Sequence, residues 1–297
     1  MKLWKFYSFG WRCWLLTYYS SEYFLLSNSQ NEHIKKIISV FLIFTLFFSL
    51  SGCSTLKQGE YAQFGYRGEA VVKEGMRIVP LDWLGNLFAI IPKLVLWNWK
   101  IERHHILDDT KKAVHDYIQD NPDLGNVAVQ LNRYAPQDAW KRLFKNKGIK
   151  WPYRYTFGIF TVLFMDTLLI NRVFAGDYYN PFTHTVNLYS DIPAVALHEL
   201  GHAKDFGSRR YRGSYAILRM LPFTDLYQEH AATEQAFSYA RSKHDVKQEI
   251  ENYQVLYPAY GTYVGGYFPI MGGTILGAIV GHIWGRSEAH ELKQTLA

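Results

Sequence analysis

The stretch His198-Glu199-Leu200-Gly201-His202 decides how the rest of this chain is interpreted. On a helix, residues four positions apart lie on one face, so the two imidazoles can bind a single Zn²⁺ through their ring nitrogens. The glutamate between them can take a proton from a metal-bound water. A catalytic zinc site also needs a third protein ligand and an open position for water or substrate.

Small and apolar residues surround this stretch, at positions 192–197 and at Ala203. A helix with such flanks is expected to be buried in the protein. Buried histidines and a buried glutamate need partners, because unpaired polar groups are costly inside a protein. One bound metal ion satisfies all three side chains, whereas a chance match on an exposed helix would not need these apolar flanks.

Residues 182–189 come just before this helix and alternate between two kinds of side chain. Phe182, His184, Val186 and Leu188 alternate with Thr183, Thr185, Asn187 and Tyr189. A period of two predicts a strand. Ser190 or Asp191 is predicted to cap the following helix, and Pro193 suits its first turn.

Residues 221–240 predict a second helix, with small residues along one stripe at Ala232, Ala236 and Ala240. Small residues allow another helix to approach closely. Glu229 lies one turn before Ala232 on the same stripe and is the first candidate for the third ligand. Glu234 is the rival ligand and points about 140° away on the helix, and His230 is a weaker candidate.

The pair of motifs, His198-Glu199-x-x-His202 and Glu229-x-x-Ala232, resembles the gluzincin zinc metallopeptidases over residues 182–240. The resemblance implies an α+β fold: a mostly helical zincin-like metallopeptidase domain with a small sheet. An edge strand, Thr183–Tyr189, would precede the metal helix and pair with an extended substrate. The resemblance also implies one Zn²⁺ on His198, His202 and Glu229, with Glu199 as the general base. Thr233 departs from the family, which usually carries Asp or Asn there.

Further side chains are candidates for supporting parts of the site. Asp205 follows His202 by three residues, so it could hydrogen-bond a ligand imidazole and orient it, or be a charge at the helix end. The donor for a developing oxyanion stays open among three residues: His230, Tyr211 and Tyr227.

The N-terminal region has the pattern of an export signal. Lys35-Lys36 precede an apolar run at 37–50, which is shorter than the roughly 20 residues of a bilayer span. The run ends in Leu50-Ser51-Gly52-Cys53, which resembles the bacterial lipobox. That resemblance implies a lipid on Cys53 and a lipid-anchored protein of the bacterial cell envelope, at the inner or the outer membrane. Residues 1–34 form a long aromatic lead: either the true start lies further in, or 37–50 is an uncleaved anchor.

The C-terminal region is rich in glycine at a spacing of four residues, at Gly261, Gly265, Gly273, Gly277, Gly281 and Gly285, with Pro269 in the missing position. No Lys, Arg, Asp or Glu occurs between Tyr263 and Trp284, so residues 263–284 could span a bilayer. The pattern resembles glycine-zipper segments of bacterial envelope proteins and predicts a membrane-embedded or oligomerising segment. A helical hairpin packed on the domain is the alternative.

Length and composition bound the remaining possibilities. The chain has 297 residues, a net charge of +6 and two cysteines. No basic tract interleaved with aromatics suggests nucleic acid, and a count of two cysteines argues against a disulfide scaffold. The predicted regions are a signal peptide (1–52), a lipidated tether (53–80), a metallopeptidase domain (81–255), a glycine-rich segment (256–286) and a polar tail (287–297).

Two functions are compatible with these patterns. The first is a membrane-associated zinc endopeptidase that hydrolyses envelope proteins or peptides. Membrane lipid would be its partner through Cys53 and residues 263–284. The second is a non-catalytic envelope lipoprotein with a structural or vestigial metal site, which forms homo-oligomers through the glycine stripe. An intact Glu199 favours the first, because a structural site needs no base.

Overall fold

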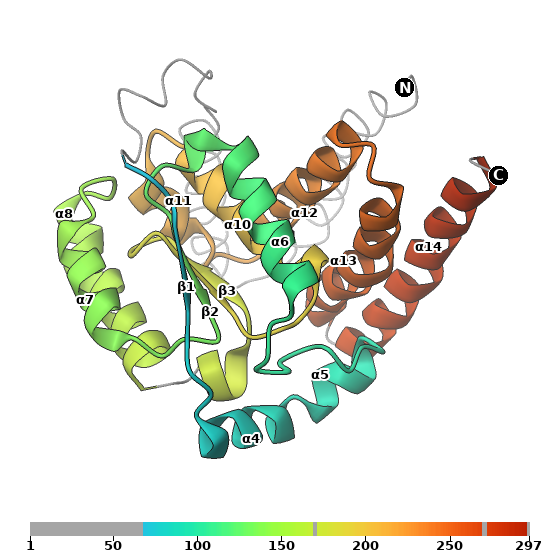
Figure 1. Ribbon diagram of the computed structural model, residues 1–297, viewed down its shortest axis with the longest axis horizontal. Helices are drawn as coiled ribbons and strands as arrows, with labels where there is room; N and C mark the ends of the chain where they lie inside the picture. Colours follow the sequence, from blue (N-terminus) through green and yellow to red (C-terminus); the bar gives the residue numbers. More distant parts are fainter. Residues whose placement is uncertain (1–67, 169–170, 269–271, 296–297) are drawn as a thin grey trace, which may run out of the picture. The chain divides into compact units, whose positions relative to one another are not determined.

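The computed structural model describes residues 68–168, 171–268 and 272–295. The predicted signal peptide, Cys53 and most of the predicted tether lie outside these residues. The described part is a mostly helical α+β fold with a small mixed sheet, as expected (Figure 1). Its strands are β1 (Val71–Glu74), β2 (Ala128–Leu131), β3 (Tyr178–Asn180) and β4 (Thr185–Leu188).

Helices make up most of the described chain, and several of them are single turns. The longer ones are α4 (Val79–Phe88), α5 (Ile90–Val95), α6 (Asp108–Asp120), α7 (Pro136–Lys145), α10 (Pro193–Gly207), α11 (Arg212–Leu218), α12 (Thr224–Ser242), α13 (Val246–Gly266) and α14 (Gly273–Thr295). The segments α8 (Trp151–Tyr153), η2 (Arg154–Gly158), α9 (Ile159–Thr161) and η3 (Val162–Thr167) follow one another as a continuous helical run, and the short turns are η1 (Pro122–Leu124) and η4 (Asn171–Ala175).

The sheet has the strand order β1-β2-β4-β3, in which β1, β2 and β4 are parallel and β3 is antiparallel to β4. The predicted strand before the metal helix is therefore present as β4. Its predicted place at the edge of the sheet is wrong, because β4 lies between β2 and β3. The alternation of side chains reports what faces the two surfaces of a sheet and says nothing about the neighbours at its hydrogen-bonding edges. The edge strand on this side is β3.

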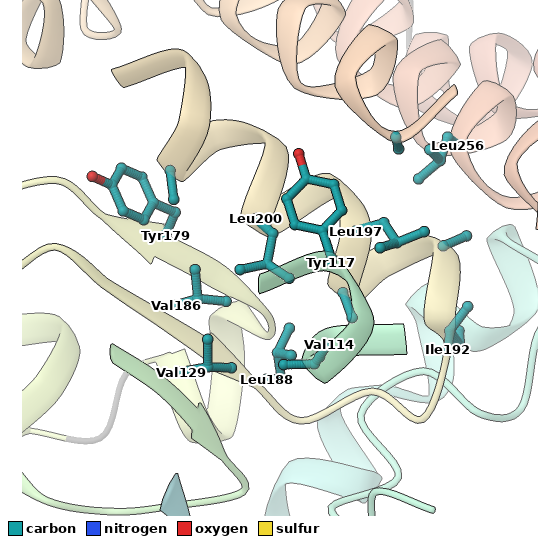
Figure 2. Packing of buried hydrophobic residues seen from close by; sticks show 14 of the residues in the cluster. Val114, Tyr117, Val129, Tyr179, Val186, Leu188, Ile192, Leu197, Leu200 and Leu256 are labelled. Atoms are coloured by element: carbon teal, nitrogen blue, oxygen red, sulfur yellow. The ribbon is translucent and has the colours of Figure 1, made fainter. Parts of the chain in front are cut away.

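The main hydrophobic core lies between the sheet and the helices α6 and α10. In Figure 2, Leu197 and Leu200 of α10 lie near Val114 and Tyr117 of α6, with Val129, Val186 and Leu188 of the sheet beneath them. A smaller core around Leu143 of α7 packs on the other side of the sheet, where α7 lies in Figure 1. Helix α10 is therefore held in place by the core along most of its length.

The loop that precedes α6 holds the connection between β4 and α10. Glu102 N–H donates to Ser190 Oγ at 2.9 Å, and Leu107 N–H donates to Asp191 Oδ1 at 2.9 Å. Ser190 and Asp191 thus bind this loop and do not cap α10, contrary to the sequence prediction. The N-cap of α10 is Ile192, and Pro193 occupies the first turn as predicted.

Helices α13 and α14 form the hairpin that was the alternative to a membrane span (orange and red in Figure 1). The glycine stripe of α14 packs against α13 of the same chain, so a Cβ on Gly277 would lie 2.0 Å from the carbonyl oxygen of Gly261. The glycines predicted to contact a second copy therefore make an intramolecular contact. Within the described ranges, no helix is both long and apolar enough to cross a bilayer.

Candidate metal centre

The site forms where α10 crosses α12 at very short range. A Cβ on Gly201 would lie 2.5 Å from the carbonyl oxygen of Ala232, so only glycine allows this approach. On α12, Ala232, Ala236 and Ala240 are all buried, as the small-residue stripe predicts. Because Glu229 lies one turn before Ala232, the contact brings its carboxylate to the face of α10 that carries the histidines.

Both imidazoles of the motif face the Glu229 carboxylate. His198 Nε2 lies 3.1 Å from Glu229 Oε2, and His202 Nε2 lies 3.4 Å from Glu229 Oε1. The two rings are 4.7 Å apart between centroids. His198, Glu199 and His202 also form a group whose ligand atoms lie within 4.8 Å of one another, which is close enough to hold a metal ion.

Charge is distributed unevenly within the site. Burial raises the pKa of Glu229, but His202, His198 and Arg219 outweigh it and hold that pKa well below its usual range. Burial lowers the pKa of both imidazoles. For His198 the hydrogen bond and the charge of Glu229 outweigh burial and leave its pKa raised, whereas the pKa of His202 stays lowered. The site therefore presents a carboxylate between two nitrogen ligands.

Glu199 lies beside this group and is also buried, with 8 % of its surface exposed. Burial is the main cause that raises its pKa to about 7, against the opposing effect of His198. The nearby negative charges of Glu229 and Asp177 raise it further. A carboxyl with a pKa near neutrality can both take up and release a proton at that pH.

Thr233 hydrogen-bonds the other nitrogen of the first imidazole, with Oγ1 lying 3.2 Å from His198 Nδ1. When Nδ1–H donates to this hydroxyl, Nε2 carries the free lone pair and faces Glu229. Thr233 is not the Asp or Asn that the gluzincin motif usually carries at this position, yet its hydroxyl lies against the imidazole that such a residue would orient.

Asp205 does not have the orienting contact that was one of its two predicted uses. Its Oδ2 accepts a hydrogen bond from the Tyr215 hydroxyl at 2.6 Å, and its Oδ1 pairs with Arg209. The spacing of Asp205 on the helix was right, but α11 supplies a tyrosine that draws the carboxylate away from the imidazoles. The other reading, a charge near the helix end, fits this arrangement.

The rival third ligands face away from the histidines. His230 is exposed, and its ring lies 6.4 Å from that of Tyr260 on α13. Glu234 is partly exposed and lies near Tyr257 of α13, whose pKa it helps to raise after the larger effects of burial, Tyr253 and Glu288.

The three candidate oxyanion donors lie close to groups other than His198 and His202. His230 faces α13, as above. Tyr211 is 47 % exposed, with the Arg210 guanidinium 5.4 Å from the centre of its ring. The Tyr227 hydroxyl accepts a hydrogen bond from Arg209 at 3.3 Å, which links it to the Asp205 network.

Two residues that the sequence did not single out lie at the site. Arg219, just after α11, pairs with Glu229 Oε1. Tyr263 of α13 is near the same carboxylate, since the charge of Glu229, followed by burial, raises the pKa of its phenol. Neither belongs to a motif. The only sequence signal is for Tyr263, which begins the uncharged stretch of the glycine-rich segment.

No family model, curated protein or solved structure matches this chain. The metal-binding capacity of His198, Glu199 and His202 on a buried helix is therefore carried by the geometry of this chain alone.

Proposed function

We propose that this protein is a zinc-dependent peptidase. The observation that carries the proposal is the convergence of His198 Nε2 and His202 Nε2 on the carboxylate of Glu229, with Glu199 beside them. Two imidazole nitrogens and one carboxylate oxygen from two helices form the ligand set of a catalytic zinc site. Arg219 pairs with Oε1 of Glu229, so Oε2, which faces His198, is the oxygen available to a metal.

Zinc in such a site would supply a Lewis acid that lowers the pKa of a water molecule. Glu199 would take a proton from this water and return it to the amine that leaves when the peptide bond breaks. A pKa of about 7 suits a group that must accept and then donate a proton. Thr233 would keep His198 in the tautomer that ligates through Nε2.

An extended substrate would pair with the edge strand β3 and not with β4, the strand expected from the sequence. The backbone of β3 makes its ladder with β4, and among the described residues no other strand pairs with it. A peptide can add to such an edge through backbone hydrogen bonds. Asp177 comes directly before β3 and is near enough to Glu199 to raise its pKa, so this edge begins beside the proposed base.

The proposed substrates are proteins or peptides of the cell envelope. Support for this location comes from the sequence, where Leu50-Ser51-Gly52-Cys53 resembles a lipobox that follows an apolar run. A lipid on Cys53 would keep the enzyme at a membrane.

Zinc content and cleavage, measured together, test the proposal. The full chain, extracted from membranes in detergent, is analysed for zinc and assayed on casein and on a peptide library, beside the variant Glu199→Gln. We expect one zinc per chain in both proteins and cleavage by the wild type alone, because Gln cannot take the proton. Absence of zinc from the wild type would overturn the proposal. Zinc with no cleavage of any substrate would favour a non-catalytic protein with a structural metal site.

A further inference from the structure

Helices α4 and α5 have their polarity inverted. The buried residues of α4 include Asp82, and the buried residue of α5 is Lys93, which is only 5 % exposed. Their outer faces instead carry large apolar side chains that are 42–70 % exposed: Val79, Trp83, Leu87, Phe88, Ile90, Ile91 and Leu94. A helix on a protein that faces only water places its charges outward and its apolar residues inward. These two helices do the reverse.

The outer face of α14 is inverted in the same way. Its glycines and Ala278 pack inward on α13, whereas its outer side chains are 42–67 % exposed: Ile275, Leu276, Ile279, Val280, Ile283 and Trp284. The inward stripe of small residues is sufficient to pack α14 on α13, so the hairpin does not require apolar side chains on the outer face. Large apolar side chains on that face are therefore unexpected for a helix that faces water.

Direct contacts join α5 and α14 into one surface. His282 Nε2 lies 2.9 Å from the carbonyl oxygen of Val95. The His282 ring stacks on Trp97 with 4.2 Å between centroids, and the Arg286 guanidinium lies 4.7 Å from the centre of the same Trp97 ring. We call the exposed apolar side chains of α4, α5 and α14, together with Trp97 and Trp99, the α4–α5–α14 surface. Figure 1 shows α4 and α5 end to end along one side of the fold, with α14 beside α5.

The charges at the borders of this surface are mostly positive: Arg77, Lys100 and Arg286 lie there, and the one acidic group, Glu288, accepts a hydrogen bond from Trp284 Nε1 at 2.8 Å. Between Met76 and Lys100 the exposed charged residues are Arg77 and Lys100, at the two ends, and the one acidic residue, Asp82, is buried. On α14, no acidic residue occurs from Gly272 to Arg286. Three tryptophans, Trp97, Trp99 and Trp284, lie near these cations in the sequence. Tryptophan and basic residues around an apolar face are typical of segments that lie at the surface of an anionic membrane.

The same charges argue against two other occupants. The N-terminal residues 1–52 carry five basic and two acidic side chains, so they have the sign of the surface they would cover. A second copy docked face to face would oppose one basic border to another, because a twofold contact pairs the same patch with itself. Anionic headgroups complement both the apolar face and its border.

We propose that the α4–α5–α14 surface binds the surface of an anionic lipid bilayer, with these helices lying in the interface between headgroups and acyl chains. The helices α4 and α5, of 10 and 6 residues, are far shorter than a bilayer span, so they would lie along the interface. This contact would be additional to a lipid on Cys53, and it does not depend on the peptidase activity.

A fluorophore that reports on its surroundings tests the proposal residue by residue. The full chain is made with Cys13→Ser and Cys53→Ser, which removes both native thiols and the lipidation site. Single cysteines at Leu87→Cys and Ile283→Cys are then labelled with a nitrobenzoxadiazole dye, with Gln119→Cys, exposed on α6, as the matched control. Vesicles of equal parts phosphatidylglycerol and phosphatidylcholine should shift the emission at positions 87 and 283 to the blue and leave position 119 unchanged.

Charge is tested by Arg77→Gln combined with Lys100→Gln. Each basic residue near an anionic surface contributes about a fivefold factor to binding, so this pair should weaken vesicle partition roughly 25-fold. Equal binding to pure phosphatidylcholine vesicles would overturn the anionic preference. Vesicle flotation without a blue shift at 87 and 283 would show that another segment binds, and it would overturn the proposal. A blue shift at positions 87 and 283 in the absence of vesicles would also overturn the proposal. If that shift grows with protein concentration, a second copy of the chain covers the surface; if it does not, another segment of the same chain covers it.

Discussion

The carboxylate of Glu229 lies 3.1 Å from His198 Nε2, although the two residues are 31 positions apart and belong to different helices. This short distance depends on a backbone contact elsewhere, because Gly201 and Ala232 allow α10 and α12 to approach until no Cβ would fit between them. The positions of Glu229 and of the two histidines relative to one another are therefore set by one helix crossing.

Replacing Glu229 by alanine should remove the metal. Two imidazoles alone hold zinc weakly, and Arg219 would be left without its carboxylate. Zinc content measured after dialysis should fall from one per chain to near zero, while circular dichroism stays helical. Glu234→Ala is the matched control on the same helix and should keep its zinc. If Glu229→Ala keeps zinc and Glu234→Ala loses it, the assignment of the third ligand is reversed.

Replacing Thr233 by valine should weaken zinc binding without changing the ligands. The variant keeps the shape of the side chain and removes the oxygen that meets His198 Nδ1. Loss of such an orienting partner typically lowers metal affinity about 10- to 100-fold. Competition with a fluorescent chelator measures the change, and Thr233→Ser should restore most of the affinity. An affinity equal to that of the wild type in Thr233→Val would show that the hydroxyl does not orient the ring.

Replacing Tyr263 by phenylalanine should slow catalysis while leaving zinc in place. The phenol keeps its proton at neutral pH as tyrosines ordinarily do, the charge of Glu229 and burial raise its pKa further, and the side chain is 38 % exposed. It is therefore a hydrogen-bond donor beside the metal ligands, and loss of one such donor costs about 10²- to 10³-fold in kcat. Tyr211→Phe is the control and should leave kcat unchanged. If Tyr211→Phe lowers kcat and Tyr263→Phe does not, the hydrogen-bond donor to the oxyanion is Tyr211, one of the candidates named from the sequence.

Replacing Glu102 by glutamine should stabilise the protein at high pH. Glu102 is 6 % exposed, and its Oε2 has no hydrogen-bond partner. Burial, then the charge of Asp177, raise its pKa to about 8, with Lys93 opposing. The folded state therefore holds a proton that the unfolded chain has lost above about pH 4.5, so this contribution to stability is present below pH 4.5 and disappears as the pH rises towards 8.

Glutamine cannot ionise, so Glu102→Gln should gain on the order of 3 kcal/mol over the wild type between pH 5 and pH 8. Urea unfolding at the two pH values measures the difference. Glu69→Gln, at an exposed position, provides the control. A constant difference across this pH range would mean that Glu102 is ionised in the folded protein.

Local pattern predicted the parts of this site that depend on one segment at a time. The helix of His198 and His202, the strand before it and the alanine stripe beside Glu229 all follow from side-chain periodicity. A close approach of another helix to the second helix was also predicted, because the alanine stripe leaves room for it. The fold class followed from the same elements.

Relationships between distant segments were not readable in this way. The place of β4 inside the sheet depends on β2 and β3, and periodicity does not specify strand neighbours. Asp205 had the right spacing for an imidazole, but Arg209 and Tyr215 bind it first. Arg219, just after α11, pairs with Glu229, and Tyr263 of α13 lies near enough for Glu229 to raise its pKa; no spacing rule links these residues to the motif.

The contact between Val95 and His282 joins residues 187 positions apart and has a consequence for how the chain folds. The parallel strands β1, β2 and β4 also pair across long loops, since Val71 lies opposite Ala128, and Ala128 lies opposite Thr185. Such long-range pairing folds slowly, because loop closure must precede the contacts that reward it. A ribosome releases α5 long before α14, so the apolar residues of α5 remain without this neighbour until α14 has been synthesised. During that interval the nascent chain is exposed to aggregation, and a chaperone or a membrane surface that covers α5 would protect it.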